Sequence, residues 1–197
     1  MGAGQEADTP LARAALDSNS LLAVTATSVT VLPGAVGKDT IRLSLDSGPL
    51  DNVTWLGGWV AGSRAGLLVL ASQCNTRLVP VAQLQLPATV HCLAGGPGVL
   101  LVQLSTGQLL SLPLPHYGQE EVVLGAGQQA VPGPPVPCPA LLWCEQGVLG
   151  LTSRGRLYCG DTEVVTGATS MAMHTSHLLL TTQVIRPLLG LGYLSLG

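Results

Sequence analysis

Apolar and polar residues alternate with a period of two along most of the chain. Short runs rich in Val, Leu, Thr and Gly are separated by small polar turns, and long patterns with a helical period are scarce. A period of two is typical of β-strands, because successive side chains of a strand point to opposite faces of the sheet. The pattern therefore predicts an all-β protein made of many short strands.

A unit of two apolar runs joined by a polar turn recurs along this pattern. Its copies begin at Leu21, Leu67, Val99, Val148 and Leu178. The starts are separated by 46, 32, 49 and 30 residues. The mean interval is about 39 residues, which is close to the length of a four-stranded propeller blade. We therefore expect a partial β-propeller, with WD40-like blades of short antiparallel strands.

Further strand-like runs accompany these copies. They are "NVTWLGGW" from Asn52, "TVHCLAGG" from Thr89, "ALLWCEQ" from Ala140 and "TEVVTG" from Thr162, the last of which supplies an outer strand. A single small sheet cannot bury both of its faces, whereas sheets stacked around an axis cover one another. Apolar residues on both faces of the strands favour this stacked arrangement.

Two other all-β architectures are compatible with short strands. A β-sandwich would show strands at similar spacing, but it would not require a hairpin repeat of about 40 residues. A lipocalin-like barrel would need longer strands in one continuous meander. The Trp-Asp and Gly-His dipeptides of typical WD repeats are absent, so the propeller prediction depends on the repeat.

The pattern divides the chain into three segments. Residues 1–16 are expected to be disordered or to hold a short helix, for which Thr9 is a suitable cap and Pro10 a suitable first residue. Residues 17–183 form the partial propeller, and residues 184–197 form a divergent tail. Within the propeller, residues 128–140 carry five prolines, which predict an extended surface loop or, as an alternative, a ligand for a Pro-binding domain.

Composition and charge narrow the classes of function. Charged residues make up 10% of the chain and apolar residues 47%, whereas soluble domains average about 25% charged residues. This imbalance predicts that much of the surface is covered, by the chain itself or by a partner. The net charge is −3 and the basic residues form no run, so nucleic-acid binding is not indicated.

The cysteines and the termini indicate an intracellular protein. The five cysteines lack any C-x-x-C pair, and no signal peptide or membrane-length apolar run is recognised. We therefore expect reduced, mostly buried thiols, a cytoplasmic location and no membrane contact. The cysteines are Cys74, Cys92, Cys138, Cys144 and Cys159. The sequon at Asn52 is then not expected to be glycosylated.

One segment has the spacing of a dinucleotide-binding fingerprint. "VVLGAGQQA" places glycines at 125 and 127 and Ala130 after an apolar run. That fingerprint requires a helix whose first amides hold the pyrophosphate. The prolines that follow exclude a helix, so no cofactor is expected there.

Histidines, cysteines and carboxylates form no convincing site. His174 and His177 lie three residues apart but within a predicted strand–turn–strand, which favours a solvated turn over a metal site. His91 and Cys92 are neighbours on a strand and therefore point to opposite faces. Glu120 and Glu121 are adjacent acids on a predicted loop. We predict no catalytic, cofactor-binding or metal-binding residue, no small-molecule ligand and no enzymatic activity.

The tryptophans are interpreted as packing residues. Trp55, Trp59 and Trp143 lie near predicted strand ends, where they are expected to pack between blades. An aromatic platform for RNA would require basic neighbours, which the sequence does not supply.

One stretch carries a family resemblance. "VLGLTSRGRLYCGDTEVVTGATSMAMHTSHLLLTT", residues 148–182, resembles part of the large scaffold subunit of the Elongator complex, the IKAP protein family. The corresponding features are the first strand, the turn with Arg154 and Arg156, the second strand, the acidic segment 161–164 and the final Leu-Leu-Leu-Thr-Thr. Weaker similarity extends back to about residue 17, and the last residues of the chain do not match.

The resemblance implies a fold and a function. The fold would be part of the second of two WD40-type propellers in that subunit. The function would be that of a non-catalytic scaffold in a complex that adds a 5-carboxymethyl-type group to the wobble uridine (U34) of tRNA. The expected partners are other Elongator subunits, with tRNA reached only indirectly, and the expected location is the cytoplasm, with the nucleus as a second. The alternative is an unrelated propeller that serves as a protein–protein interaction module.

Overall fold

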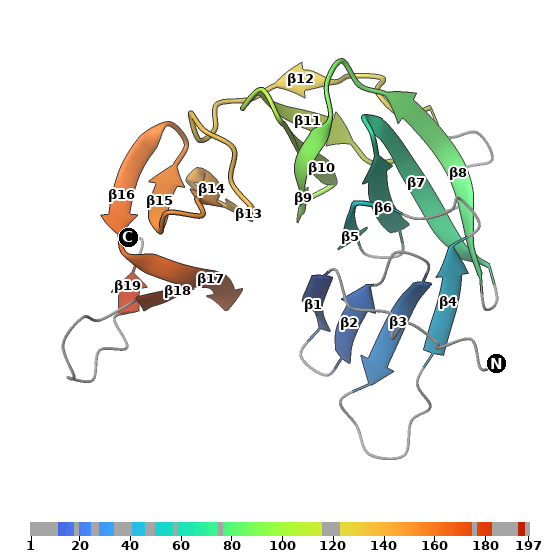
Figure 1. The fold of residues 1–197 in the computed structure, drawn as a ribbon, viewed down its shortest axis with the longest axis horizontal. Helices are drawn as coiled ribbons and strands as arrows, with labels where there is room; N and C mark the ends of the chain where they lie inside the picture. Colours follow the sequence, from blue (N-terminus) through green and yellow to red (C-terminus); the bar gives the residue numbers. More distant parts are fainter. Residues whose placement is uncertain are drawn as a thin grey trace, which may run out of the picture. The chain divides into compact units, whose positions relative to one another are not determined.

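The computed structural model describes residues 12–17, 20–24, 28–33, 41–45, 50–56, 59–74, 77–115, 123–174, 177–182 and 193–195. Their regular structure is entirely β (Figure 1), which confirms the predicted fold class. The described residues contain no helix that is long and apolar enough to cross a bilayer. The chain forms two compact units. Unit 1 comprises Met1–Pro87 and Pro115–Leu124, and unit 2 comprises Ala88–Leu114 and Gly125–Gly197.

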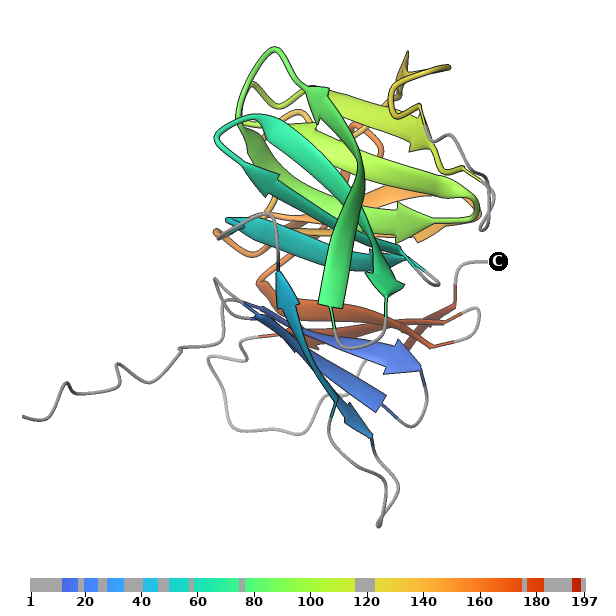
Figure 2. The ribbon, with the colours of Figure 1, turned by 90° about the vertical axis from the view of Figure 1, so that its right-hand side faces the viewer.

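Unit 1 consists of two four-stranded antiparallel meanders, which lie one above the other in Figures 1 and 2. Parallel pairing of Ser44 with Arg77 and of Leu45 with Leu78 joins their last strands, β4 and β8, into one eight-stranded sheet. The first meander is β1 (Ala12–Asp17), β2 (Ser20–Val24), β3 (Ser28–Pro33) and β4 (Ile41–Leu45). The second is β5 (Asn52–Leu56), β6 (Trp59–Arg64), β7 (Leu67–Cys74) and β8 (Arg77–Gln85).

Unit 2 contains three further sheets in chain order. The first is β9 (Val90–Gly96), β10 (Val99–Leu104), β11 (Leu109–Pro113) and β12 (Gln129–Ala130). The second is β13 (Ala140–Cys144), β14 (Gly147–Leu151), β15 (Arg156–Cys159) and β16 (Thr162–Thr166). The third is β17 (Ala168–His174), β18 (His177–Thr182) and β19 (Tyr193–Ser195). Successive small antiparallel sheets of this kind are the repeating element of a propeller.

The expected helix near the N-terminus is wrong over the part that the structure describes. Residues 12–17 form β1, which pairs with β2 from Ala12 opposite Val24 to Asp17 opposite Ser20. Ala, Arg and Leu favour helix locally, but an isolated segment this short gains little from propensity alone. Pairing with a neighbouring strand therefore decides its conformation.

The repeat is more regular than the apolar runs indicate. The second strand of each meander of unit 1 and of each sheet of unit 2 begins at Ser20, Trp59, Val99, Gly147 and His177. The intervals between these starts are 39, 40, 48 and 30 residues. The copy of the repeat that the sequence places at Leu67 is β7, the third strand of its meander. The second strand, β6, is harder to recognise from the sequence because Gly62 and Ser63 interrupt its apolar residues.

Two clusters of buried residues hold the sheets of unit 2 together. The first cluster joins the β9–β12 sheet to the β13–β16 sheet and contains Cys92, Ala94, Leu101, Leu109, Cys138, Leu141 and Val148. The second cluster joins the β13–β16 sheet to the β17–β19 sheet and contains Cys144, Leu149, Leu151, Leu157, Ala168, Leu178 and Leu180. We call these contacts the first interface and the second interface.

Candidate functional site

The first interface is closed by the Pro-rich segment, residues 131–139, which connects β12 to β13. Gln103 of β10 is fully buried and reaches this segment with both ends of its amide. Its Nε2 donates to the carbonyl of Val136 at 3.1 Å, and its Oε1 accepts from the backbone N–H of Cys138 at 2.7 Å. A buried amide is tolerated because these partners replace water. Gln103 therefore anchors a segment more than thirty residues away in the sequence.

The same segment packs closely against β14. A Cβ added at Gly150 would meet the ring of Pro134 and would lie 2.9 Å from the Sγ of Cys138. Pro134 and Cys138 are both buried. The sequence predicted residues 128–140 as a surface loop. Residues 131–139 do lack regular structure, but Gln129–Ala130 form β12, Ala140 begins β13, and Pro134 and Cys138 lie in the interior. No side chain larger than hydrogen fits at position 150.

The thiols at the first interface are protonated and shielded. Burial raises the pKa of Cys92 to about 11 and the pKa of Cys138 to about 11. The Cys92 thiol donates to the carbonyl of Pro139 at 3.6 Å, and the Cys138 thiol donates to the carbonyl of Val136 at 3.4 Å. Because the thiolate is the nucleophilic form, neither group is suited to catalysis at neutral pH.

Reduced thiols were predicted, and the four cysteines whose side chains the structure describes are free. Cys92, Cys138 and Cys144 are buried, and Cys159 is partly exposed. Burial, followed by the neighbouring Cys144, raises the pKa of Cys159. The side chain of Cys74 lies outside the described residues.

The second interface is open at one end. A cavity of about 530 Å³ lies there, between the β14–β15 turn (residues 152–155), the corner leading into β17 (residues 167–171) and the start of β13. Leu151, Ala168 and Met171 supply apolar walls, and the first two belong to the second cluster. The turn and the corner supply hydroxyl groups and the guanidinium of Arg154. The cavity thus combines apolar walls with a polar rim, as ligand-binding clefts do.

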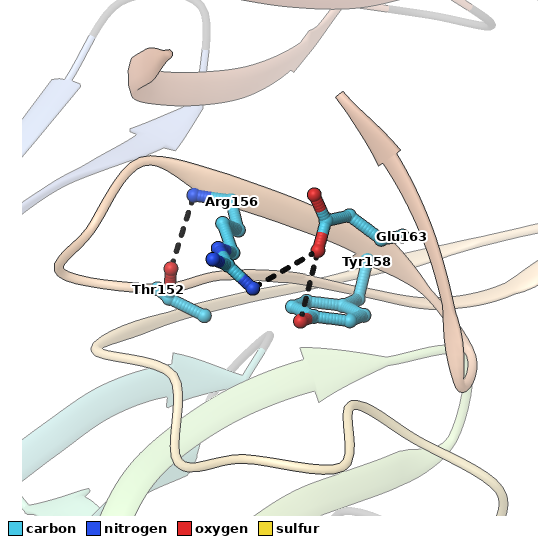
Figure 3. A network of polar contacts seen from close by, with 4 residues as sticks. All are labelled: Thr152, Arg156, Tyr158 and Glu163. Atoms are coloured by element: carbon cyan, nitrogen blue, oxygen red, sulfur yellow. Dashed lines mark hydrogen bonds and ion pairs between the residues drawn. The ribbon is translucent and has the colours of Figure 1, made fainter. Parts of the chain in front are cut away.

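A polar network lies on β15, β16 and the β14–β15 turn of the β13–β16 sheet (Figure 3). The Glu163 carboxylate pairs with the Arg156 guanidinium at 3.5 Å and accepts a hydrogen bond from the Tyr158 hydroxyl at 3.2 Å. The backbone N–H of Arg156 also donates to the hydroxyl of Thr152 at 3.0 Å. Arg156 and Tyr158 are two residues apart on β15 and therefore project on the same face. The side-chain contacts of the network join β15 to β16, whereas the Thr152 hydroxyl of the turn is held by a backbone N–H.

The dinucleotide-like segment has the course that the prolines predicted. Residues 124–127 form a turn, with φ of 96° at Gly125 and 76° at Gly127, and the short strand β12 follows. A positive φ is available to glycine without steric cost. No helix begins at this point, so the segment cannot hold a pyrophosphate as the fingerprint does.

The two histidine-containing motifs are arranged differently. His91 is exposed whereas Cys92 is buried, so the two side chains point to opposite faces of β9. His174 and His177 are opposite each other in the β17–β18 pair, and His177 is exposed. The residues described by the structure include no group of three or more His, Cys, Asp or Glu side chains that could hold a metal ion. Glu120 and Glu121 lie outside the described residues.

Trp143 confirms the packing role expected for the tryptophans. Its ring lies 3.2 Å from a Cβ placed at Gly96 and thus covers the backbone of β9, although the residue is 37% exposed. Trp59 is buried in unit 1. The side chain of Trp55 lies outside the described residues.

Two residues of these sites were not singled out from the sequence. Gln103 is a lone amide within the run "VLLVQLSTG", and a single polar residue in an apolar strand is a signal for a buried hydrogen-bonding role. Arg154 was noted only as part of a turn. Its position at a cavity depends on how the third sheet of unit 2 packs, which no local pattern indicates.

Several solved structures share this fold, and one of them is described as a β-propeller domain. YCF48 from Cyanidioschyzon merolae superimposes with a TM-score of 0.57 and 13% identity, over 91% of this chain and 68% of that one. The β-propeller domain of Myceliophteria thermophila Cps50 (Swd1) gives a TM-score of 0.53 and 15% identity, over 84% of this chain. The computationally designed Ika4 protein superimposes with a TM-score of 0.51 and 12% identity, over 83% of this chain and 94% of that one.

The length of the match supports an incomplete propeller. The chain spans 59% of the Cps50 (Swd1) propeller domain and 55% of Kluyveromyces lactis Hsv2, to which it is 14% identical with a TM-score of 0.53 over 83% of this chain. At these identities the likeness concerns the fold alone. The sheets described above are therefore the blades of a partial β-propeller.

No curated protein sequence is a significant match. A family profile, however, gives a more specific relationship than the structures do. The family profile described as the ELP1 N-terminal second β-propeller matches residues 68–184. This range contains both interfaces of unit 2 and covers more than half of the 197 residues. The chain therefore belongs to the ELP1 N-terminal second β-propeller family.

Proposed function

We propose that the chain is a non-catalytic scaffold segment of the Elongator complex. In this role it contacts other Elongator subunits and supports the 5-carboxymethyl-type modification of the tRNA wobble uridine, with tRNA reached only through the assembled complex. The observation that carries the proposal is the family match over residues 68–184, which coincides with the stacked sheets of the propeller. A propeller of this family acts as a scaffold, and the finer assignment follows from the complex to which the family belongs.

The chemistry of the described residues is in keeping with a scaffold. The thiols of Cys92 and Cys138 have a pKa of about 11, and Glu163 is engaged by an arginine and a tyrosine. Every buried side-chain nitrogen or oxygen atom in the described part of the chain has a hydrogen-bond partner. Satisfied polar groups and shielded thiols stabilise a platform, whereas an enzyme requires groups poised to react. We expect no cofactor or small-molecule substrate, and a cytoplasmic and nuclear location.

Affinity purification tests this proposal. A tagged copy of the 197-residue chain would be expressed in cultured cells and purified, and the co-purified proteins would be identified by mass spectrometry. We expect other Elongator subunits to be enriched, and the 5-carboxymethyl-type wobble uridine content of tRNA to fall as the chain competes with the endogenous scaffold. The control is Leu101→Asp, which places a charge in a fully buried position and should abolish both effects. Enrichment of unrelated partners, with no other Elongator subunit, would contradict the proposal and favour an independent interaction module.

A further inference from the structure

The cavity at the open end of the second interface has an unusual charge balance. Among the described residues that line it, Arg154 is the only charged one. The remaining polar lining consists of hydroxyl groups and backbone from the β14–β15 turn and the β17 corner. The volume of about 530 Å³ is large enough for several side chains of a peptide. The described lining of the cavity therefore offers one positive charge, with no acidic residue beside it, next to an apolar wall.

Two arginines of the same turn differ in their partners. Arg156 is paired with Glu163 at 3.5 Å (Figure 3). Arg154 is exposed, and among the described residues no ion pair or hydrogen bond engages its side chain. Glu163, one of the acids close to this turn in sequence, is thus already engaged by the other arginine. The guanidinium of Arg154 remains available for an external carboxylate, which it is shaped to bind through two parallel hydrogen bonds.

The hydroxyl groups of the rim are held in place by neighbours. The Thr152 hydroxyl accepts from the N–H of Arg156 at 3.0 Å. The hydroxyls of Thr169 and Ser170 both contact the hydroxyl of Thr181, at 2.8 and 2.7 Å. A rim that is ordered before binding loses less conformational entropy when a ligand arrives. The apolar wall formed by Leu151 and Met171 can then cover an aliphatic side chain next to the bound acid.

We propose that this cavity binds an acidic peptide segment of a partner protein, with Arg154 holding a carboxylate and the apolar wall holding an adjacent aliphatic side chain. A nucleic-acid ligand is disfavoured because it requires several cations along its backbone, whereas this rim has one and the chain carries a net charge of −3. The inference rests on the proposed scaffold role, since it names the chemistry by which one partner would be recognised.

The test uses the full chain and a matched pair of peptides. The fluorescently labelled probe is acetyl-Ala-Glu-Leu-Glu-Ala-amide, and its neutral counterpart carries Gln in place of both Glu residues. Binding is followed by fluorescence anisotropy at low and high salt. We expect the acidic peptide to bind in the submillimolar range, the neutral peptide to bind about tenfold more weakly, and added salt to weaken only the acidic peptide.

Two arginine variants locate the binding. Arg154→Gln should reduce affinity for the acidic peptide by about tenfold, whereas Arg156→Gln, at the start of the adjoining strand β15, should leave it nearly unchanged. Equal losses in the two variants, equal binding of the two peptides, or no saturable binding up to about 1 mM would each overturn the inference. Tighter, Arg154-dependent binding of a uridine tetranucleotide would also overturn it in favour of a nucleic-acid site. Failure of the peptide with intact co-purification of Elongator subunits would sink this inference alone, whereas loss of co-purification would sink the scaffold role.

Discussion

The two interfaces of unit 2 have cores of equal size but different ends. Each cluster contains seven buried residues among those described. The first interface is covered by the Pro-rich segment 131–139, which Gln103 holds through two hydrogen bonds. No segment in the described part of the chain covers the second interface in this way, and this interface ends in the cavity beside Arg154. Apolar packing therefore holds both pairs of sheets together, while the connecting segments decide which interface is accessible.

The comparison separates stability from recognition. Burial of aliphatic side chains is non-directional and acts the same way at both interfaces. Polar groups act through specific partners, and they differ between the two interfaces. The amide of Gln103 is buried at the first interface, and the side chain of Arg154 is exposed at the second. Substitutions in the two cores should therefore have similar effects, and substitutions of the polar residues should not.

The largest effects are expected in the two cores. Leu101→Ala at the first interface and Leu178→Ala at the second remove side chains that are 0% and 2% exposed. Each should lower the free energy of unfolding by about 2–5 kcal/mol, because a cavity remains where the side chain was. Urea denaturation measures both. The control is Leu179→Ala on β18, which is 38% exposed and should change stability by about 0.5 kcal/mol or less. A large loss at only one interface would show that the cores are not equivalent.

Gln103→Leu should have the next largest effect, and only at the first interface. The substitution leaves the N–H of Cys138 without its partner and removes one of the two donors to the carbonyl of Val136, at a cost of about 1–3 kcal/mol. Hydrogen exchange at the Cys138 amide should become faster, since the Pro-rich segment loses its anchor. Gln108→Leu, at an exposed position, serves as the control. Unchanged exchange in Gln103→Leu would mean that packing of Pro134 alone holds the segment.

The thiols of the first interface should make its stability depend on pH. The pKa of Cys92 and of Cys138 is about 11 in the folded chain, compared with 9.0 for an ordinary thiol. The unfolded chain therefore loses these protons first as pH rises, so stability is constant below about pH 9 and falls as pH rises through about 11. The double variant Cys92→Ala with Cys138→Ala should lose about 2–5 kcal/mol less than the wild type over this range. Parallel pH profiles would contradict the predicted burial of both thiols.

The smallest effect is expected from the polar network outside both interfaces. Glu163→Gln removes the ion pair with Arg156. The side chain of Glu163 is 34% exposed and that of Arg156 is 54% exposed. Exposed pairs contribute about 0–1 kcal/mol, and salt screens them. The loss of stability should therefore be below about 1 kcal/mol and should disappear at high salt. Asp161→Asn, which removes a nearby exposed carboxylate that accepts only from Thr162, should show no salt-dependent difference.

Several parts of the fold could be predicted from local pattern. The alternation of apolar residues requires strands, and a repeat of about 40 residues requires sheets that cover one another. The prolines of residues 131–139 exclude regular structure there by removing donors and fixing φ. The assignment of Cys92 and His91 to opposite faces follows from the same two-residue period.

Other parts depended on contacts between distant residues. The strand at Ala12–Asp17 forms because β2 pairs with it, against a local preference for helix. The repeat unit at Leu67 was assigned one strand late, because apolar contrast identifies the most buried strand and not its order within a sheet. The anchor formed by Gln103 joins residues that lie 33 and 35 positions apart. No pattern within a short window contains this information.

The sequence by itself determined that the chain forms β-strands, that they repeat, and to which family the chain belongs. Each of these depends only on the order of residues along the chain. The tertiary structure alone decided that a Pro-rich connection covers one interface, that Gly150 must remain without a side chain, and that Arg154 lies exposed at a cavity while Arg156 is paired with Glu163. The physical reason is that burial and pairing are properties of distance in space, and the packing of one sheet on the next sets those distances.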